Sequence, residues 1–276
     1  MIDCTVLIMT FNESHNLDAC LNSVVKRFRR ICVVDSFSTD NTLEIASSYP
    51  EVEIFKNQFE SWGSQRNWLF QAANIKTEYV LFLDADEIIS DPLAKELEQE
   101  LKKNEYDNAK FAVKNIFLGT WIKYSYGHPS IVRIFRTSTS PYYHSEGARE
   151  YPTINGKQVY LKNPLIHRDN RPIEEWFKKH ISNAKRESEY LINISSDSSK
   201  NNSLKDFIRN KIWVNLPIFF RSFIYFIYRY ILRGGFLDGK AGFIFCFFQA
   251  YSYQNMISTF IYQQNIKATE LPSDGK

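Results

Sequence analysis

Two aspartates one residue apart, Asp84 and Asp86, are the side chains of this sequence best suited to chemistry. They follow an apolar run, Tyr79–Leu83, of the kind that forms a strand buried on both faces in a parallel sheet. Ligands of open α/β sheets bind outside the carboxyl ends of the strands, where both carboxylates would lie. Two carboxylates so close repel each other unless a cation intervenes, and a divalent metal with a phosphate-bearing substrate is the commonest arrangement. A strand followed by a solvated acidic turn is the alternative.

The rest of the N-terminal half alternates between strand and helix patterns. Three more apolar runs have the length of buried strands: Cys4–Thr10, Ile31–Val34 and Val52–Phe55. Helical spacing occupies the segments between them: 16–28, the stretch from about 41, and 64–73. This alternation predicts an α/β fold with a central parallel sheet and helices on both faces. Shorter β-like runs between 110 and 161 predict antiparallel strands that complete a mixed sheet.

The composition excludes several classes of protein. With 44% hydrophobic and 24% charged residues, the chain is globular rather than disordered. A net charge of +3 is too small to indicate nucleic-acid binding. The four cysteines have no CxxC spacing and no signal peptide is recognisable, so we expect reduced core cysteines in a cytoplasmic protein. No GxGxxG follows the first strand, which disfavours a dinucleotide-dependent dehydrogenase.

The C-terminal region has a different character. Ile212–Leu232 is rich in aromatic and aliphatic residues but is interrupted by Pro217 and two arginines, and Ala241–Tyr262 contains several amides and hydroxyls. Neither segment is a clean membrane span, which needs roughly 20 predominantly apolar residues. Aromatic-rich helices flanked by Arg and Lys suit a membrane interface instead. The alternative is a helical pair packed on the N-terminal domain or on a second subunit of a homo-oligomer.

A polar, Ser/Asn-rich stretch, Ser195–Ser203, is predicted to be an exposed loop that separates two regions. We expect a catalytic domain over 1–195, with a ligand-binding half at 1–103 and a second half at 104–170. A helical region, with the potential to contact a membrane, would follow at 204–276.

Several short segments occur in a specific order along the chain. They are TFNE at 10–13, VVDSFSTDNT at 33–42, SQRN at 64–67, LFLDADE at 81–87, VRIFR at 132–136, the stretch 150–167, and YILRGGFLDGKAGF at 230–243. In these segments the sequence resembles the family 2 glycosyltransferases, which have the GT-A fold, and more narrowly the β-glucosyltransferases of the bacterial lipopolysaccharide core. The resemblance covers nearly the whole chain.

The resemblance implies an inverting, metal-dependent transfer of a hexose, with glucose expected, from a UDP-sugar. The acceptor would be a lipid-linked saccharide in lipopolysaccharide or other cell-surface polysaccharide synthesis. The enzyme would lie peripherally on the inner face of the cytoplasmic membrane. Three other interpretations remain: a nucleotide-sugar-binding scaffold without turnover, a transferase with another donor or with a protein or peptide acceptor, and a phosphatase or phosphotransferase. The last would place its Asp-x-Asp on the first strand, whereas three strands precede it here.

The resemblance also implies which residues bind the donor. Asp35 would contact the base and Glu13 the ribose, with Thr10 and Phe11 beside them. Asp35 could instead cap the turn that follows it, and Glu13 could start the next helix. Arg66 would contact the base edge or the diphosphate, because a guanidinium matches flat acceptors bidentately. Its alternative is the ordinary surface arginine of a helix.

The metal and the base complete the expected site. Asp86 would hold Mg²⁺ or Mn²⁺ across the two phosphates, while Asp84 would face the ribose or the donor sugar. His167 would contact the metal or the diphosphate, unless it is a structural histidine. Glu150 lies six residues before Gly156, the family's spacing for the catalytic base. Arg149 precedes it where relatives usually have His, so Glu146 is the alternative base.

Overall fold

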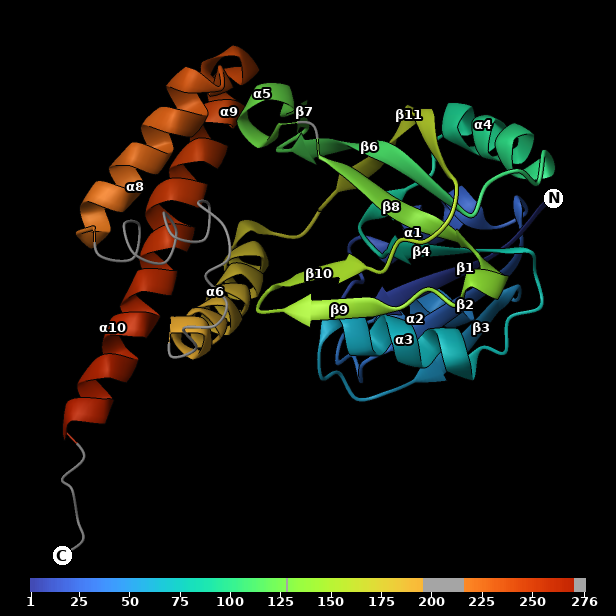
Figure 1. Cartoon of the computed structure of the whole chain (residues 1–276), viewed down its shortest axis with the longest axis horizontal. Helices are drawn as coiled ribbons and strands as arrows, with labels where there is room; N and C mark the ends of the chain where they lie inside the picture. The colour runs from blue at the N-terminus through green and yellow to red at the C-terminus, as the bar shows by residue number, and fades with distance from the viewer. Residues whose placement is uncertain (128, 196–215, 271–276) are drawn as a thin grey trace, which may run out of the picture. The chain divides into compact units, whose positions relative to one another are not determined.

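The computed structural model describes residues 1–127, 129–195 and 216–270 (Figure 1). The described residues form two compact units. The first contains Met1–Ser145 and Arg149–Arg171, and the second contains Glu146–Ala148 and the described part of Pro172–Lys276. Apart from Ser195, the predicted loop at Ser195–Ser203 lies outside the described residues.

The first unit is built on a mixed sheet, which has nine strands within the described residues. The strands are β1 (Ile2–Thr10), β2 (Phe28–Asp35), β3 (Val52–Lys56), β4 (Tyr79–Asp84), β5 (Glu87–Ile88), β6 (Asn108–Phe117), β7 (Thr120–Trp121), β8 (Ser130–Arg136) and β11 (Gln158–Arg168). Their order is β3-β2-β1-β4-β8-β6-β11-β5, with β7 paired to β6. Strands β1 to β4, β6 and β11 run one way, and β5, β7 and β8 run the other. The predicted mixed, mainly parallel sheet is therefore confirmed.

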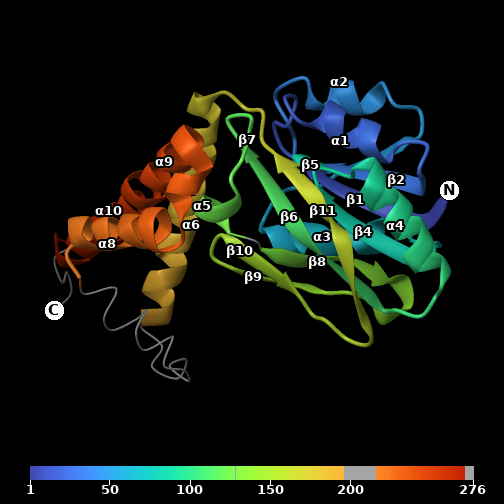
Figure 2. The same cartoon turned by 90° about the horizontal axis from the view of Figure 1, so that it is seen from above.

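Helices cover both faces of this sheet (Figures 1 and 2). They are α1 (Leu17–Val24), α2 (Thr42–Ser47), α3 (Trp62–Ala72) and α4 (Asp91–Lys102), while the short α5 (Lys123–Tyr126) follows β7 at the end of the sheet. Helices α1, α2 and α4 pack against one face, where Leu81 and Leu83 of β4 lie. Helix α3 packs against the other face, where Val80 and Phe82 lie. Because strand side chains alternate between faces, a sheet covered on both sides requires the unbroken apolar run of β4.

Two predicted helix boundaries change in the structure. The helical pattern over 16–28 extends too far, because α1 ends at Val24 and Phe28 already begins β2. Lys26 has φ 67°, a left-handed conformation that stops a helix. The pattern over 64–73 starts too late, because Ser61 and Ser64 form a capping box that opens α3 at Trp62.

A hairpin of β9 (Tyr143–Glu146) and β10 (Arg149–Pro152) is fastened to α3. The Asn67 side chain donates to the Tyr143 carbonyl at 2.9 Å and accepts from the Tyr143 amide at 2.8 Å. The Gly63 amide donates to Ser145 Oγ at 2.8 Å. These bonds place β10 beside the middle of α3, which decides where Glu150 lies.

The second unit is helical, as predicted, and rich in aromatic residues. Its elements are α6 (Ile173–Ser195), α8 (Ile218–Ile227), a π-helical segment (Tyr228–Leu232), a 3-10 turn (Gly235–Asp238), α9 (Gly239–Phe247), a second π-helical segment (Phe248–Tyr253) and α10 (Gln254–Glu270). Trp176 and Phe177 of α6 pack against Phe248, with ring centroids 5.7 and 5.0 Å away. Within the described parts of the chain, none of the helices is both long and apolar enough to traverse a bilayer.

Replacing Gly63 with alanine should loosen the hairpin from α3. A Cβ at this position would lie 2.7 Å from Ser145 Oγ and 2.9 Å from the Tyr143 carbonyl oxygen. We expect Gly63→Ala to lower the free energy of unfolding by about 1–3 kcal/mol in urea titrations, the usual cost of overpacking. The control Gln71→Ala, on the exposed side of the same helix, should change it by less than about 0.5 kcal/mol. An equal effect of both substitutions would contradict this packing.

Candidate active site

The carboxyl ends of the first strands meet at one edge of the sheet. Thr10 of β1 is paired in register with Asp35 of β2, and Met9 is paired with Asp84 of β4. Thr10, Asp35 and Asp84 therefore lie at the same edge of the sheet. Phe11, the next residue after β1, is exposed at this edge.

Asp35 is completely buried and accepts hydrogen bonds on both carboxylate oxygens. Thr10 Oγ1 donates to Oδ1 at 3.1 Å, and the Ser38 amide donates to Oδ2 at 2.8 Å. The turn-capping role weighed for Asp35 is therefore present. Glu13, also buried, accepts from Asn16 Nδ2 at 2.9 Å. Asn16 and Glu13 lie at the start of α1, so this carboxylate is fixed by the segment that opens the helix.

A buried arginine joins Asp84 to Glu150, the predicted catalytic base. Arg66 Nη2 donates to Asp84 Oδ1 at 2.5 Å. Its Nε lies 2.9 and 2.8 Å from the two oxygens of Glu150. The side chain of Arg66 is only 1% exposed, so it is not the surface arginine considered as an alternative. The guanidinium also lies 5.2 Å from the ring centroid of Tyr143 and 5.9 Å from that of Phe82.

Arg133, on β8, is a second cation in the same cluster. Its Nη2 donates to Asp84 Oδ2 at 2.6 Å, and its Nη1 donates to Glu150 Oε1 at 3.1 Å. Burial alone would raise the pKa of Asp84, but the guanidinium groups of Arg133 and Arg66 outweigh it and hold that pKa below its ordinary value. Asp84 is therefore an anion that both arginines neutralise.

Glu87 is the acid of this cluster whose negative charge is least stabilised by the arginines. Its Oε2 accepts the Asp84 backbone amide at 2.8 Å, and its Oε1 lies 3.4 Å from Arg133 Nη2. Burial raises the pKa of Glu87 to about 7, against the attraction of Arg133 and with the repulsion of Asp84. A carboxyl group that is protonated over part of the neutral pH range thus lies next to the Asp-x-Asp turn, where it accepts from the Asp84 amide.

A second cluster surrounds Asp86, which is also buried. His167 Nε2 lies 3.4 Å and Arg171 Nη2 lies 3.5 Å from Asp86 Oδ2. His167 is brought there by strand pairing, because it is the register partner of Glu87 where β11 meets β5. Arg171 also lies 3.4 Å from Glu13 Oε1, so it links the predicted metal residue to the predicted ribose residue.

Sequence reasoning missed Arg171. It follows β11 and pairs with its neighbour Asp169 at 2.9 Å, but its other two partners, Glu13 and Asp86, lie far away along the chain. A weak signal was the run of charged and polar residues, His167 to Arg171, directly after an apolar strand. That is the same kind of strand ending from which Asp84 and Asp86 were singled out.

These residues fit a divalent metal of the kind that phosphates help to hold. Within the described residues, no group of three or more His, Cys, Asp and Glu side chains could hold a metal alone. Mg²⁺ is usually bound by one or two carboxylates, with the remaining ligands from water and substrate phosphates. Asp86 with His167 matches that pattern. Asp84 does not, because both of its oxygens accept from guanidinium groups.

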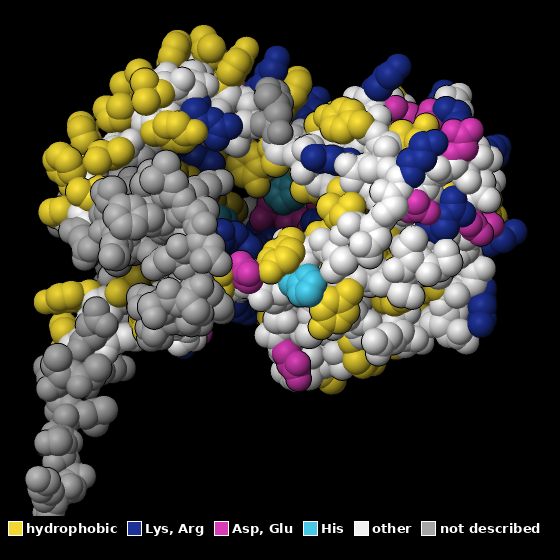
Figure 3. Space-filling view, in the orientation of Figure 1, with side chains coloured by type: hydrophobic (Ala, Val, Ile, Leu, Met, Phe, Trp, Pro, Cys, Tyr) yellow, Lys and Arg dark blue, Asp and Glu magenta, His cyan; other side chains and the backbone are white. Residues whose placement is uncertain are grey.

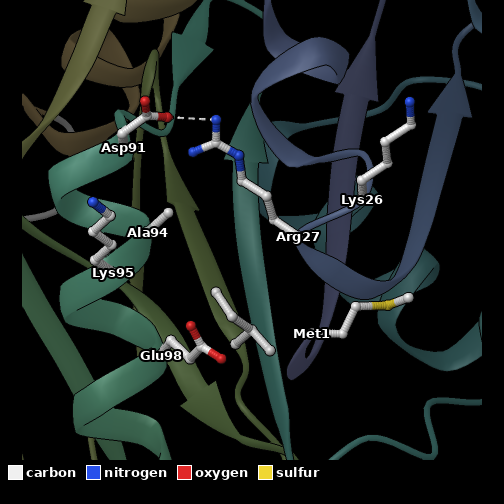
Figure 4. Close-up of a pocket in the computed structure, with 8 residues that line it drawn as sticks. Met1, Lys26, Arg27, Asp91, Ala94, Lys95 and Glu98 are labelled. Atoms are coloured by element: carbon white, nitrogen blue, oxygen red, sulfur yellow. Dashed lines mark hydrogen bonds and ion pairs between the residues drawn. The ribbon is translucent and has the colours of Figure 1, made fainter.

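A separate pocket of about 290 Å³ lies at the amino end of the sheet in this unit (Figure 4). It is lined by Met1, Lys26, Arg27, Asp91 and Lys95, among others, and an Arg27–Asp91 ion pair of 2.6 Å closes one side. Sheets of this type bind their ligands at the opposite, carboxyl end. The pocket is therefore distinct from the candidate site.

The comparison with protein families shows which family the chain belongs to. The model of Glycosyl transferase family 2 matches residues 5–253, which is most of the sequence. The chain therefore belongs to this family. Together with the mixed sheet and the acids at its carboxyl edge, this membership confirms the predicted GT-A fold.

Individual relatives match shorter parts. Glycosyltransferase SunS, SPbeta prophage-derived, from Bacillus subtilis (strain 168) is 37% identical over 94 residues, 32% of this chain and 21% of SunS. An uncharacterized glycosyltransferase of Rickettsia bellii is 33% identical over 94 residues, 34% of this chain and 31% of that protein. The aligned segment thus spans about a fifth of SunS and a third of the Rickettsia protein.

Among solved structures, S. aureus TarS 1-349 has 17% sequence identity and a TM-score of 0.45. The alignment covers 95% of this chain and 91% of that one. At this TM-score the likeness adds nothing to what the family match establishes.

Removing the guanidinium of Arg66 should destabilise the first unit strongly. Arg66→Met would leave Asp84 and Glu150 with Arg133 as their remaining cation, and breaking a buried ion pair from one side costs about 3–5 kcal/mol. We expect that loss in urea unfolding at neutral pH. The control Arg29→Met removes an exposed pair with Asp3 and should cost less than about 1 kcal/mol. Wild-type stability in Arg66→Met would show that the cluster is not structural.

Proposed function

We propose that this glycosyltransferase moves a hexose, glucose in the first instance, from a UDP-sugar to a lipid-linked saccharide, with inversion at the anomeric carbon. The reaction would serve lipopolysaccharide or other cell-surface polysaccharide synthesis at the inner face of the cytoplasmic membrane. Family membership supports the reaction class. The observation that supports binding of a nucleotide sugar is the row of acids at the carboxyl edge of the sheet, where the buried Asp35 and Asp86 and the partly exposed Asp84 end or follow strands.

On the donor side, Asp35 would recognise the base and Glu13 the ribose, with Thr10 and Phe11 lining the same edge. Asp84 would face the ribose or the sugar. The buried Nη1 of Arg66 has no hydrogen-bond partner within the described residues. We propose that it donates to the nucleotide sugar. Arg171 joins this set, since it already contacts both Glu13 and Asp86.

Mg²⁺ or Mn²⁺ would be held by Asp86 and His167 together with the diphosphate. When bound, such an ion neutralises the charge that develops on the leaving diphosphate. Arg171 would then exchange its contact with Asp86 for one with a phosphate oxygen, a geometry that guanidinium groups favour. Its positive charge thus remains in the site whether or not the donor is bound.

Glu150 is our proposed base. The acceptor hydroxyl oxygen would form a bond to the anomeric carbon, the bond from that carbon to the diphosphate oxygen would break, and the hydroxyl proton would pass to the Glu150 carboxylate. Both oxygens of Glu150 accept from Arg66, so one of these hydrogen bonds must open first. Glu146 is less suited, because its Oε2 accepts from the Tyr190 hydroxyl at 2.8 Å.

Glu150→Gln should abolish transfer while leaving donor binding nearly intact. Gln keeps an acceptor oxygen for Arg66 but cannot take a proton, and loss of a general base costs about 10²–10⁴-fold in rate. Transfer is measured with radiolabelled UDP-glucose and a lipid-linked saccharide, and donor affinity by calorimetry. The matched control Glu146→Gln should retain transfer. If Glu146→Gln is the inactive variant instead, the base is misassigned; donor binding without turnover in the wild type would favour a scaffold.

Donor binding should also be visible without an acceptor. In a thermal-shift panel of nucleotide sugars, the UDP-sugar should raise the melting temperature more with Mn²⁺ than with chelator, because ligands that bind only the folded state stabilise it. Asp86→Asn should remove the manganese-dependent part of that shift. The control Asp91→Asn, an exposed acid away from the site, should keep it. A shift of the same size with chelator would argue against metal dependence.

A further inference from the structure

An exposed apolar surface lies on the helical hairpin formed by α8, the turn after it and α9. The side chains of its large hydrophobic residues are exposed: Phe220, Phe223, Ile224, Tyr228, Ile231, Leu232, Phe236, Leu237, Phe243 and Phe247. Figure 3 shows hydrophobic side chains gathered over this part of the second unit. Contiguous exposed patches of this kind mark interaction sites, whereas single exposed hydrophobic residues do not. We refer to these residues as the aromatic face.

The charges around the aromatic face are almost all positive. Between residues 216 and 262 the basic residues are Arg221, Arg229, Arg233 and Lys240, and the one acid, Asp238, is only 8% exposed. Arg229 lies 5.1 Å from the ring centroid of Tyr225, and Arg233 lies 6.0 Å from that of Tyr228. Arginines that lie against aromatic rings keep their charge beside the apolar surface.

The turn between the helices projects two apolar side chains. Phe236 and Leu237 are 50% and 59% exposed within the 3-10 turn. Gly234 and Gly239, with φ of 76° and 64°, bracket this turn in conformations that favour glycine. A Cβ on Gly235 would lie 2.7 Å from the Arg229 carbonyl oxygen, so the turn is packed tightly against the preceding helix. The result is a closely packed turn with an apolar tip.

We infer that the aromatic face docks on the anionic surface of a lipid bilayer, with Phe236 and Leu237 as the inserting tip. Binding of this kind gains from buried apolar area and from attraction of basic side chains to anionic headgroups. A second copy of the chain is a poorer partner, because a two-fold interface would bring like positive charges together. The inference deepens the proposed function, since a lipid-linked acceptor lies in such a surface, but lipid binding requires neither donor nor metal.

Vesicle co-sedimentation of the full chain tests this inference. The wild type should bind vesicles of phosphatidylcholine mixed with phosphatidylglycerol, bind pure phosphatidylcholine weakly, and be released by salt. The double substitution Phe236→Ser with Leu237→Ser should weaken binding at least about ten-fold. Lys240→Glu should weaken it by about five-fold or more. Tyr160→Ser, at a 57% exposed position of β11, is the matched control and should bind like the wild type.

Three results would overturn the inference: no binding of the wild type to anionic vesicles, unchanged binding by the tip variant at unchanged melting temperature, or a wild-type dimer that the tip variant dissociates. The proposed function is tested separately by transfer to a detergent-solubilised acceptor. Absence of vesicle binding with intact transfer refutes only the docking of the aromatic face on a bilayer. Vesicle binding without any transfer refutes the proposed function alone.

Discussion

The site depends on one buried cation, the guanidinium of Arg66. It joins the end of β4, through Asp84, to β10, through Glu150, and it is itself carried by α3. Removing a guanidinium from water is costly, and only close, well-directed hydrogen bonds to carboxylates offset that cost. The bonds that fasten the β9–β10 hairpin to α3 bring Glu150 within reach. The sheet, the helix and the hairpin are thus coupled through a single side chain.

The charge balance around Arg66 also explains the properties of its neighbours. Asp84, Glu87 and Glu150 supply three carboxyl groups, while Arg66 and Arg133 supply two guanidinium groups. Asp84 receives the shortest contacts from both arginines and is held ionised. Glu87 receives one long contact and is the most deeply buried of the three acids, so the excess negative charge is relieved by its raised pKa. Donor binding at this edge would act on a cluster that is already close to neutral.

The sequence predicts the sheet edge better than the contacts formed there. Apolar runs that end in Thr10, Asp35 and Asp84 place these residues together, because parallel strands present their carboxyl ends on one side. The contact of Arg66 with Glu150 spans 84 positions and depends on how the hairpin docks on α3, which no local pattern encodes. Arg171 was missed for the same reason. The overlong helix at 16–28 reflects the apolar spacing of Val24 and Phe28, which continues through a left-handed residue.

The alternation of side chains along β11 limits the insertions and deletions that this sequence can accept. It carries Leu165 in the hydrophobic core and, two residues later on the same side of the strand, His167 beside Asp86. Side chains on a strand alternate, so adding or deleting one residue between the core position and the histidine would turn the imidazole to the opposite face of the sheet. Natural variation at 165–167 should therefore occur by exchange of side chains, and gaps in alignments should fall outside this segment.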